Sequence, residues 1–111
     1  MVASNSGGEN KRNPPSIDRL IHEPARYTIM AYLYVVDSAD FLFLVKQTEL
    51  TWGNLSAHIG KLEAAGYVEI KKEFLGKKPH TMAVLTKAGR LAFEAYRRDM
   101  KRILGELPSS K

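Results

Sequence analysis

Residues 51–67, TWGNLSAHIGKLEAAGY, carry the strongest structural signal in this chain. Leu55, Ile59 and Leu62 recur at the spacing of one helix face. The stretch begins with a threonine, whose side chain can accept a hydrogen bond from a free N–H of a helix's first turn. Gly66 near its end readily takes the left-handed conformation that closes a helix. We therefore predict an amphipathic helix that stops at Gly66.

The face of this helix opposite its apolar stripe is unusual, because it is built mostly from small residues. Solvated surface helices usually present long charged side chains there, whereas a small face lets the helix approach another molecule closely. The residues on this face are Gly53, Asn54, Ala57, Gly60, Lys61 and Ala64.

The size and charge of the chain favour one small domain with a polyanionic partner. Its 111 residues suffice for a single domain with a modest core. Seventeen Lys and Arg residues against twelve Asp and Glu give a net charge of +5, and the pI is about 9.6. Such an excess favours nucleic acid as partner. The alternative is a mildly basic protein without one.

Several function classes are excluded by what the sequence lacks. It has no cysteine, which excludes disulfides, thiolate catalysis and cysteine zinc sites. His22, His58 and His80 lack metal-ligand spacing, so we predict neither a metal nor a cofactor. We find no nucleophile–base pair or phosphate loop, so we predict no enzymatic activity. The longest apolar run, residues 41–45, is too short to span a membrane, and no signal pattern begins the chain. We expect a cytoplasmic protein.

Three helices are predicted before the central stretch. Residues 1–15, rich in Ser, Asn and Gly, read as a flexible arm. Residues 16–22 resemble a short first helix, and a second helix begins with Pro24 at its first position and runs to Val36. Residues 39–47 are predicted as a third helix. Its Leu42 and Phe43 exceed what one small core can bury, so we expect one of them at an interface or an edge.

After Gly66 the hydrophobic period changes to that of strands. Residues 68–75 and 80–85 alternate, and residues 76–79 between them form a basic turn, which predicts a β-hairpin. Thr86 then caps a final helix that extends to about Leu104, longer than the body it could cover. We assign residues 16–105 to one domain and 106–111 to a flexible tail.

Together these elements predict a mainly α fold with a small β-hairpin, of the α+β class. The third and fourth helices form a helix-turn-helix, the hairpin is its wing, and a long C-terminal helix follows. In such an arrangement the second helix of the pair enters the DNA major groove.

Three motifs carry a resemblance that covers roughly residues 17–104. They are LT-x-GNLS-x-HI-x-KLE-x-AGYV at 50–68, GKKPHT at 76–81 and LT-x-x-GR at 85–90. They resemble small winged-helix regulators of bacteria and archaea, of the MarR/ArsR-like kind. The resemblance implies a homodimer that binds double-stranded DNA and regulates transcription. Leu42, Phe43 and Trp52 depart from the family pattern, which has polar or small residues there.

The DNA-contacting residues are expected on the helix 51–65 and on the wing 74–81. Asn54 can bond an adenine edge or a phosphate. Thr51 and Ser56 are more typical of caps or phosphate contacts. Trp52 either packs across helices or rests on the DNA backbone, and His58 either anchors the helix or meets a phosphate. The full predicted set is Thr51, Trp52, Asn54, Ser56, Ala57, His58, Lys61, Lys77, Lys78 and His80.

The apolar stripe of the last helix predicts a partner helix, since it exceeds what one small domain can cover. A symmetric dimer would place two recognition helices about 34 Å apart on a two-fold operator. The predicted interface residues are Ile17, Leu20, Leu91, Ala95, Tyr96, Met100, Ile103 and Leu107.

Two other functions stay open at this point. A winged helix can instead serve as a protein-interaction module of a larger assembly, which the apolar Leu42 and Phe43 favour. It can also bind DNA without sequence preference, like a chromatin protein, which the shortage of long polar side chains on the small face favours. The sequence names no operator, no effector and no direction of regulation.

Overall fold

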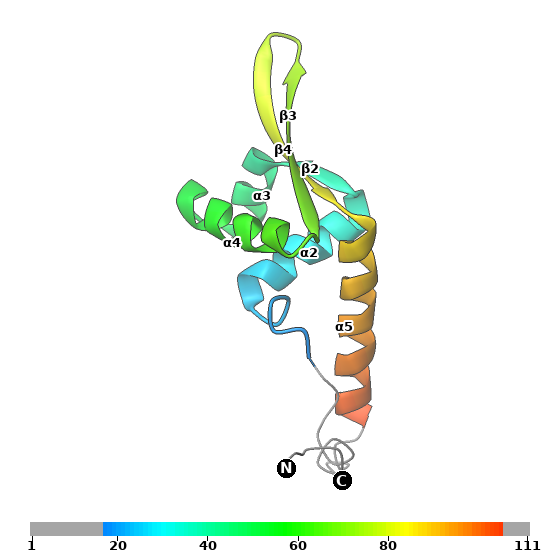
Figure 1. Cartoon of the computed structure of the whole chain (residues 1–111). Coiled ribbons are helices and arrows are strands. Elements are labelled where there is room, and N and C mark those ends of the chain that lie inside the picture. Colours follow the sequence, from blue (N-terminus) through cyan, green and yellow to red (C-terminus); the bar gives the residue numbers. More distant parts are fainter. Residues whose placement is uncertain (1–16, 106–111) are drawn as a thin grey trace.

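The computed structural model describes residues 17–105, in which a three-stranded antiparallel sheet accompanies the helices. The predicted winged-helix architecture is confirmed. The β3–β4 hairpin and α5 project in opposite directions from the body formed by α2, α3 and α4 (Figure 1). In chain order the elements are α2 (Pro24–Val36), β2 (Ser38–Asp40), α3 (Phe41–Thr48), α4 (Trp52–Ala64), β3 (Val68–Leu75), β4 (Lys78–Leu85) and α5 (Lys87–Gly105).

The core lies where α4 packs against the other elements. The predicted stripe of Leu55, Ile59 and Leu62 is fully buried. Burial of each such side chain contributes roughly 1.5–3 kcal/mol to stability. The other side chains of the core come from the neighbouring helices and the sheet, and they include Ile29, Met30, Leu33, Phe41, Leu44, Val68, Ala83 and Phe93.

Both predicted ends of α4 are confirmed. The Thr51 hydroxyl oxygen accepts a hydrogen bond from the Asn54 N–H at 3.1 Å. Gly66 has a φ of +83°, and the N–H of Tyr67 donates to the Leu62 carbonyl at 3.0 Å. This left-handed turn closes the helix and directs the chain into β3.

The helix predicted over residues 16–22 is wrong for the described residues 17–22, which form a turn. The Asp18 carboxylate accepts hydrogen bonds from the N–H groups of Leu20 and Ile21, at 3.0 and 3.3 Å. A short polar side chain that binds the nearby backbone competes with helical hydrogen bonds. The turn still places Ile21 in the core. The predicted arm at 1–15, Ser16 and the tail at 106–111 lie outside the described residues.

The third helix begins later than predicted, because residues 38–40 form the edge strand β2. Ala39 pairs with Ala83 of β4 and is buried there. Asp40 then caps α3 by accepting a hydrogen bond from the Leu42 N–H at 2.7 Å. A strand of three residues is too short to show a hydrophobic period, so only its pairing with β4 defines it.

The hairpin is longer and its turn tighter than predicted. Its strands pair in register from Val68 opposite Leu85 to Leu75 opposite Lys78, so only Gly76 and Lys77 connect them. Gly76 has a φ of +66°, as expected for the first central residue of a type II′ turn. Lys78 and Pro79, predicted in the turn, therefore belong to β4.

The last helix starts at its predicted cap. Thr86 accepts a hydrogen bond from the Gly89 N–H at 2.9 Å and donates to the Gly66 carbonyl at 2.6 Å. Phe93, which was not singled out from the sequence, is buried in the core, and Leu91, predicted at the dimer interface, is exposed in the single chain.

Candidate nucleic-acid interface

Helices α3 and α4 form the predicted helix-turn-helix, and the outer face of α4 is open. Glu49 takes a left-handed conformation, with a φ of +59°, and ends α3. Asn54, Ala57 and Lys61 are exposed on α4. A methyl group built on Gly53 would meet no atom within 4 Å. This face has the shape that close approach to a groove requires.

The first turn of α4 carries the residues with polar groups suited to DNA. The Asn54 side chain is exposed, whereas Ser56 is half-buried. The Thr51 oxygen already serves as the helix cap, so the prediction of its capping role is the one that the geometry supports. Lys61 lies two turns further along the same helix and is exposed.

Trp52 packs across helices, one of the two roles left open by the sequence. Its ring centroid lies 5.4 Å from that of Phe41 in a tilted arrangement. The side chain is nevertheless 48% exposed. One edge of the indole is therefore fixed against α3, and the other remains on the surface beside Gly53.

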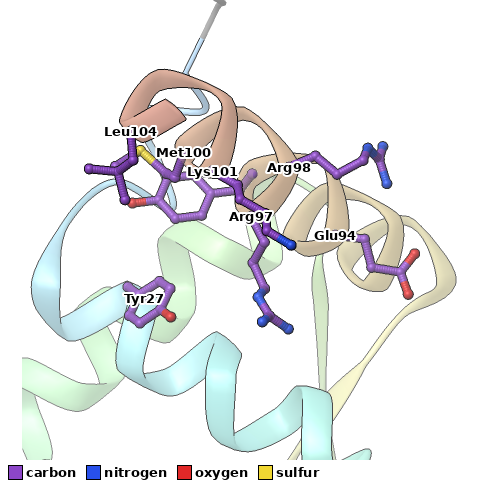
Figure 2. Close-up of a pocket in the computed structure, with 8 residues that line it drawn as sticks. Tyr27, Glu94, Arg97, Arg98, Met100, Lys101 and Leu104 are labelled. Atoms are coloured by element: carbon purple, nitrogen blue, oxygen red, sulfur yellow. The ribbon is translucent and has the colours of Figure 1, made fainter. Parts of the chain in front are cut away.

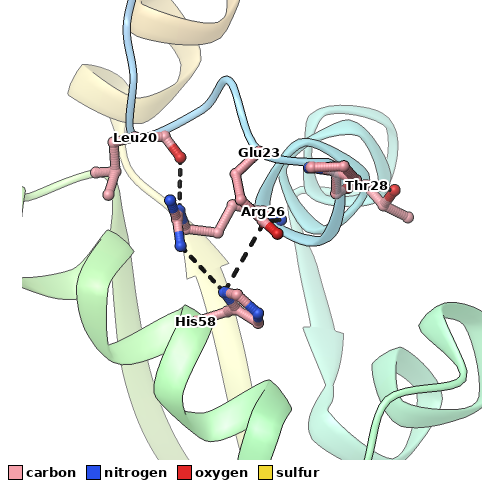
Figure 3. Close-up of polar contacts among 6 residues, drawn as sticks. Leu20, Glu23, Arg26, Thr28 and His58 are labelled. Atoms are coloured by element: carbon pink, nitrogen blue, oxygen red, sulfur yellow. Dashed lines mark hydrogen bonds and ion pairs between the residues drawn. The ribbon is translucent and has the colours of Figure 1, made fainter.

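His58 joins α4 to α2. Its Nδ1 lies 3.1 Å from a terminal nitrogen of Arg26 and 3.9 Å from the Glu23 carboxylate (Figure 3). A guanidinium can only donate, so Nδ1 is the acceptor in this bond and the ring proton lies on Nε2. Arg26 also donates from Nε to the Leu20 carbonyl at 2.6 Å. This network supports the anchoring role of His58.

His80, predicted to contact DNA, is paired with Asp40 within the chain. Its Nδ1 forms a hydrogen bond and ion pair with the Asp40 carboxylate. Burial raises the pKa of Asp40, but the hydrogen bonds from His80 and the Leu42 N–H outweigh it, so this pKa lies below its usual value. The pair links the first half of β4 to the residue that caps α3.

The wing presents basic and apolar side chains together. Lys71, Lys72, Lys77 and Lys78 are all exposed along the hairpin. Phe74 and Leu75 at the end of β3 are 72% and 57% exposed. Sequence reasoning assigned these two residues to a strand and missed their position at a free tip. Two adjacent apolar residues directly before a glycine turn were the available signal.

A cavity beside α5 was not predicted. It has a volume of about 640 Å³ and lies between α2 and α5, with Tyr27 on one side and Met100 and Leu104 on the other (Figure 2). Tyr96 also lines it, and its hydroxyl lies 2.8 Å from Nδ1 of His22. Burial, and to a smaller extent Tyr27, raises the pKa of Tyr96. The remaining lining residues are Glu94, Arg97, Arg98 and Lys101.

The predicted dimer residues occupy different environments. Tyr96 is buried in the core of its own chain, whereas Met100 and Ile103 are half-buried. Ile17, Leu20 and Ala95 are also half-buried, and Leu91 is exposed. Leu107 lies outside the described residues.

Residues 17–105 were also searched for metal-binding clusters and for membrane-spanning helices. They contain no cluster of three His, Cys, Asp or Glu side chains with the geometry to hold a metal ion. None of their helices combines the length and apolar character needed to cross a membrane.

Comparisons with known proteins place this fold in a family. Residues 25–104 match the family described as winged helix DNA-binding domain. A protein of uncharacterised function from Methanocaldococcus jannaschii is 36% identical over 78 residues, which cover 70% of this chain and 85% of that protein.

Solved structures agree with this match. The transcriptional regulator homologue from Pyrococcus horikoshii superposes with a TM-score of 0.75 at 28% identity, over 81% of this chain and 91% of that one. The regulator BldR from Sulfolobus solfataricus shares the fold, with a TM-score of 0.66 at 17% identity over 89% and 70% of the chains. AbfR, solved bound to DNA, shares it with a TM-score of 0.67 at 16% identity over 80% and 67%. The chain therefore belongs to the winged helix DNA-binding domain family.

Proposed function

We propose that this protein is a sequence-specific regulator of transcription that binds double-stranded DNA as a homodimer. Helix α4 enters the major groove, and the β3–β4 wing contacts the backbone or the minor groove. The observation that carries the proposal is the exposed small face of α4 directly after the α3 turn. The function requires no cofactor and no catalytic step.

The groove dimensions support this use of α4. The major groove of B-DNA is about 12 Å wide, and a helix with large outer side chains fills it before its backbone comes near the bases. The open space over Gly53 and Gly60 lets α4 lie deep in the groove. Asn54 then comes within reach of base edges, where an amide bonds adenine through two atoms.

The charge distribution supports the wing as a phosphate-binding element. Lys77 and Lys78 are exposed at its tip, and Lys61 is exposed on α4. AbfR, a protein of the same fold, has been solved bound to DNA. Each lysine that neutralises a phosphate adds about 0.9 to the slope of log affinity against log salt concentration.

The dimer is supported by the shape of α5. This helix runs from residue 87 to 105 and projects away from the body (Figure 1). Leu104 on its last turn is 63% exposed, and Ile103 is half-buried. A second α5 packed on these residues would remove them from water. It would also pair two recognition helices for a two-fold operator.

A duplex shift assay across a salt series tests the proposal. The wild-type chain should bind genomic fragments at low salt, and the double variant Lys77→Gln, Lys78→Gln should bind more weakly with a salt slope lower by about 2. Lys87→Gln, on the exposed start of α5, is the matched control and should leave both quantities unchanged. Absence of binding to any fragment at low salt would refute the proposal.

Sequence specificity needs a separate measurement, because a chromatin-like binder would also pass the shift assay. Footprinting across the genome should show protected sites with two-fold symmetry. Uniform protection would instead identify a non-specific DNA-binding protein.

A protein-interaction module is the second candidate, and one surface favours it. Leu42 and Phe43 are exposed on α3, and the Tyr32 ring meets the Phe43 ring edge-on at 5.9 Å. Val35 nearby along the chain is also exposed. If this surface serves the function, Leu42→Ser should abolish the activity of the assembly and leave DNA binding unchanged.

A further inference from the structure

The tip of the wing exposes an aromatic side chain to solvent. Phe74 is 72% exposed, two residues before the turn residue Gly76. The hairpin carries it beyond the helices, so the core formed by residues 17–105 cannot cover it (Figure 1). An exposed phenylalanine on a projecting hairpin is suited to contact with another molecule.

The pairing of the strands fixes which side of the hairpin carries Phe74. Side chains alternate along β3, so Phe74 shares a face with Val68 and Ile70, which pack against the core. Its partner across the strands is Pro79. Leu75 lies on the opposite face. Phe74 therefore lies on the face of the sheet that packs against the helices, but at a part of the hairpin that extends past them.

The charges around this apolar tip identify the partner. From residue 71 to residue 80 the hairpin holds Lys71, Lys72, Lys77 and Lys78, and Glu73 is its one carboxylate in that span. A hairpin tip that carries exposed lysines on both of its faces beside an exposed phenylalanine matches a surface that is anionic outside and apolar inside. Duplex DNA has this character, since phosphates line the groove and stacked bases lie within it.

We propose that Phe74 is a minor-groove wedge that inserts at a base step and opens its stacking, with the lysines held on the flanking phosphates. This rests on the proposed DNA-binding function. Apolar side chains that enter the minor groove unstack base pairs and kink the duplex. Pyrimidine–purine steps such as TA and CA unstack most readily. Phe74 thus selects flexible steps and adds specificity that the small face of α4 cannot supply.

The test measures unstacking directly. Duplexes of about 30 base pairs are selected from a randomised pool by the wild-type protein, and the complexes are treated with permanganate, which oxidises unstacked thymines. The wild-type complex should show reactive thymines at the wing positions. Phe74→Ala should lose this reactivity and bind about five- to a hundredfold more weakly, and Phe74→Trp should keep both.

Leu75→Ala is the matched control. It removes another exposed apolar side chain, from the opposite face of the same tip, and should leave the thymines reactive. Both positions lie outside the core, and thermal unfolding should show the same midpoint for all variants. Loss of reactivity with Leu75→Ala but not with Phe74→Ala would overturn the assignment.

The other outcomes separate this inference from the proposed function. Failure of the wild-type chain to bind any duplex refutes both. Tight binding without reactive thymines refutes the wedge alone. If Phe74→Ala lowers the mass of the free protein, or its binding to phosphatidylglycerol vesicles, while thymine reactivity persists, the tip contacts a second copy or a membrane and the wedge is refuted.

Discussion

Gly89 lies directly against the backbone of Tyr67. A methyl group added to Gly89 would come within 2.1 Å of the Tyr67 carbonyl oxygen. That same oxygen accepts a hydrogen bond from the Thr86 N–H at 3.0 Å. The start of α5 is thereby packed against the junction between the recognition helix and the wing, through contacts that leave no room for a side chain.

Gly89→Ala should therefore destabilise the protein by roughly 1–3 kcal/mol, because the helix must move away from the sheet. Urea unfolding measures this change. Gly60→Ala is the control, since a methyl group there meets no atom within 4 Å. In a helix interior it should stabilise by roughly 0.5–1 kcal/mol. Equal behaviour of the two variants would contradict the packing explanation.

Tyr67→Phe should change the stability of the protein in alkali. The Tyr67 hydroxyl donates to the Asp18 carboxylate at 2.5 Å. This bond, followed by burial and the carboxylate charge, raises the pKa of Tyr67 to about 12. The unfolded chain loses this proton near pH 10 while the folded chain keeps it. The stability contributed by the bond is thus fully present below pH 10 and is lost as the pH rises toward 12.

Urea unfolding of both proteins between about pH 9 and 11.5 measures this effect. The wild-type free energy of unfolding should fall by roughly 1–3 kcal/mol more than that of Tyr67→Phe. Tyr32→Phe removes a hydroxyl bonded to Gln47 on the surface and should follow the wild-type curve. If the free energies of unfolding of wild type and Tyr67→Phe change in parallel with pH, the bond to Asp18 does not raise the pKa of Tyr67.

Ala57→Leu should preserve the fold and weaken DNA binding by about tenfold or more, which corresponds to roughly 1.4 kcal/mol. Ala57 is exposed on the outer face of α4, so a leucine there holds the helix away from the groove. Titration of a fixed duplex measures the change. Ala88→Leu, a matched exposed substitution on α5, should bind as wild type does. Unchanged affinity of Ala57→Leu would show that this face does not enter the groove.

Ile103→Asp should convert a dimer into a monomer. Ile103 is half-buried on the projecting part of α5 and does not belong to the core, so a charge there opposes a helix–helix contact more than folding. Light scattering should give twice the 12.5 kDa chain mass for wild type and the single mass for the variant. Operator affinity should fall about a hundredfold or more, because the two half-sites are no longer bound together.

The control for the dimer is Arg102→Ser, in the same turn of α5. Arg102 is exposed and pairs with Asp99 of its own helix, at 2.9 Å. This variant should remain a dimer. A wild-type chain of single mass would contradict the dimer itself.

The elements that could be predicted from the sequence are those whose signals are local. Thr51, Gly66 and Thr86 marked helix ends that the structure shares, because capping depends on hydrogen bonds within a few residues. The stripe of α4 and the alternation of β3 follow from periodicity alone. These features were enough to predict a helix-turn-helix followed by a wing.

Tertiary structure decided what depends on contacts between distant residues. Strand β2 exists because Ala39 meets Ala83, and His80 is hydrogen-bonded to Asp40, a residue far from it in the sequence. The turn at Asp18 replaces a helix because the carboxylate binds the local backbone and Tyr67. Phe74 is exposed because the hairpin extends beyond the helices. A residue's pattern fixes its local conformation, but only the packed fold decides what that residue can reach.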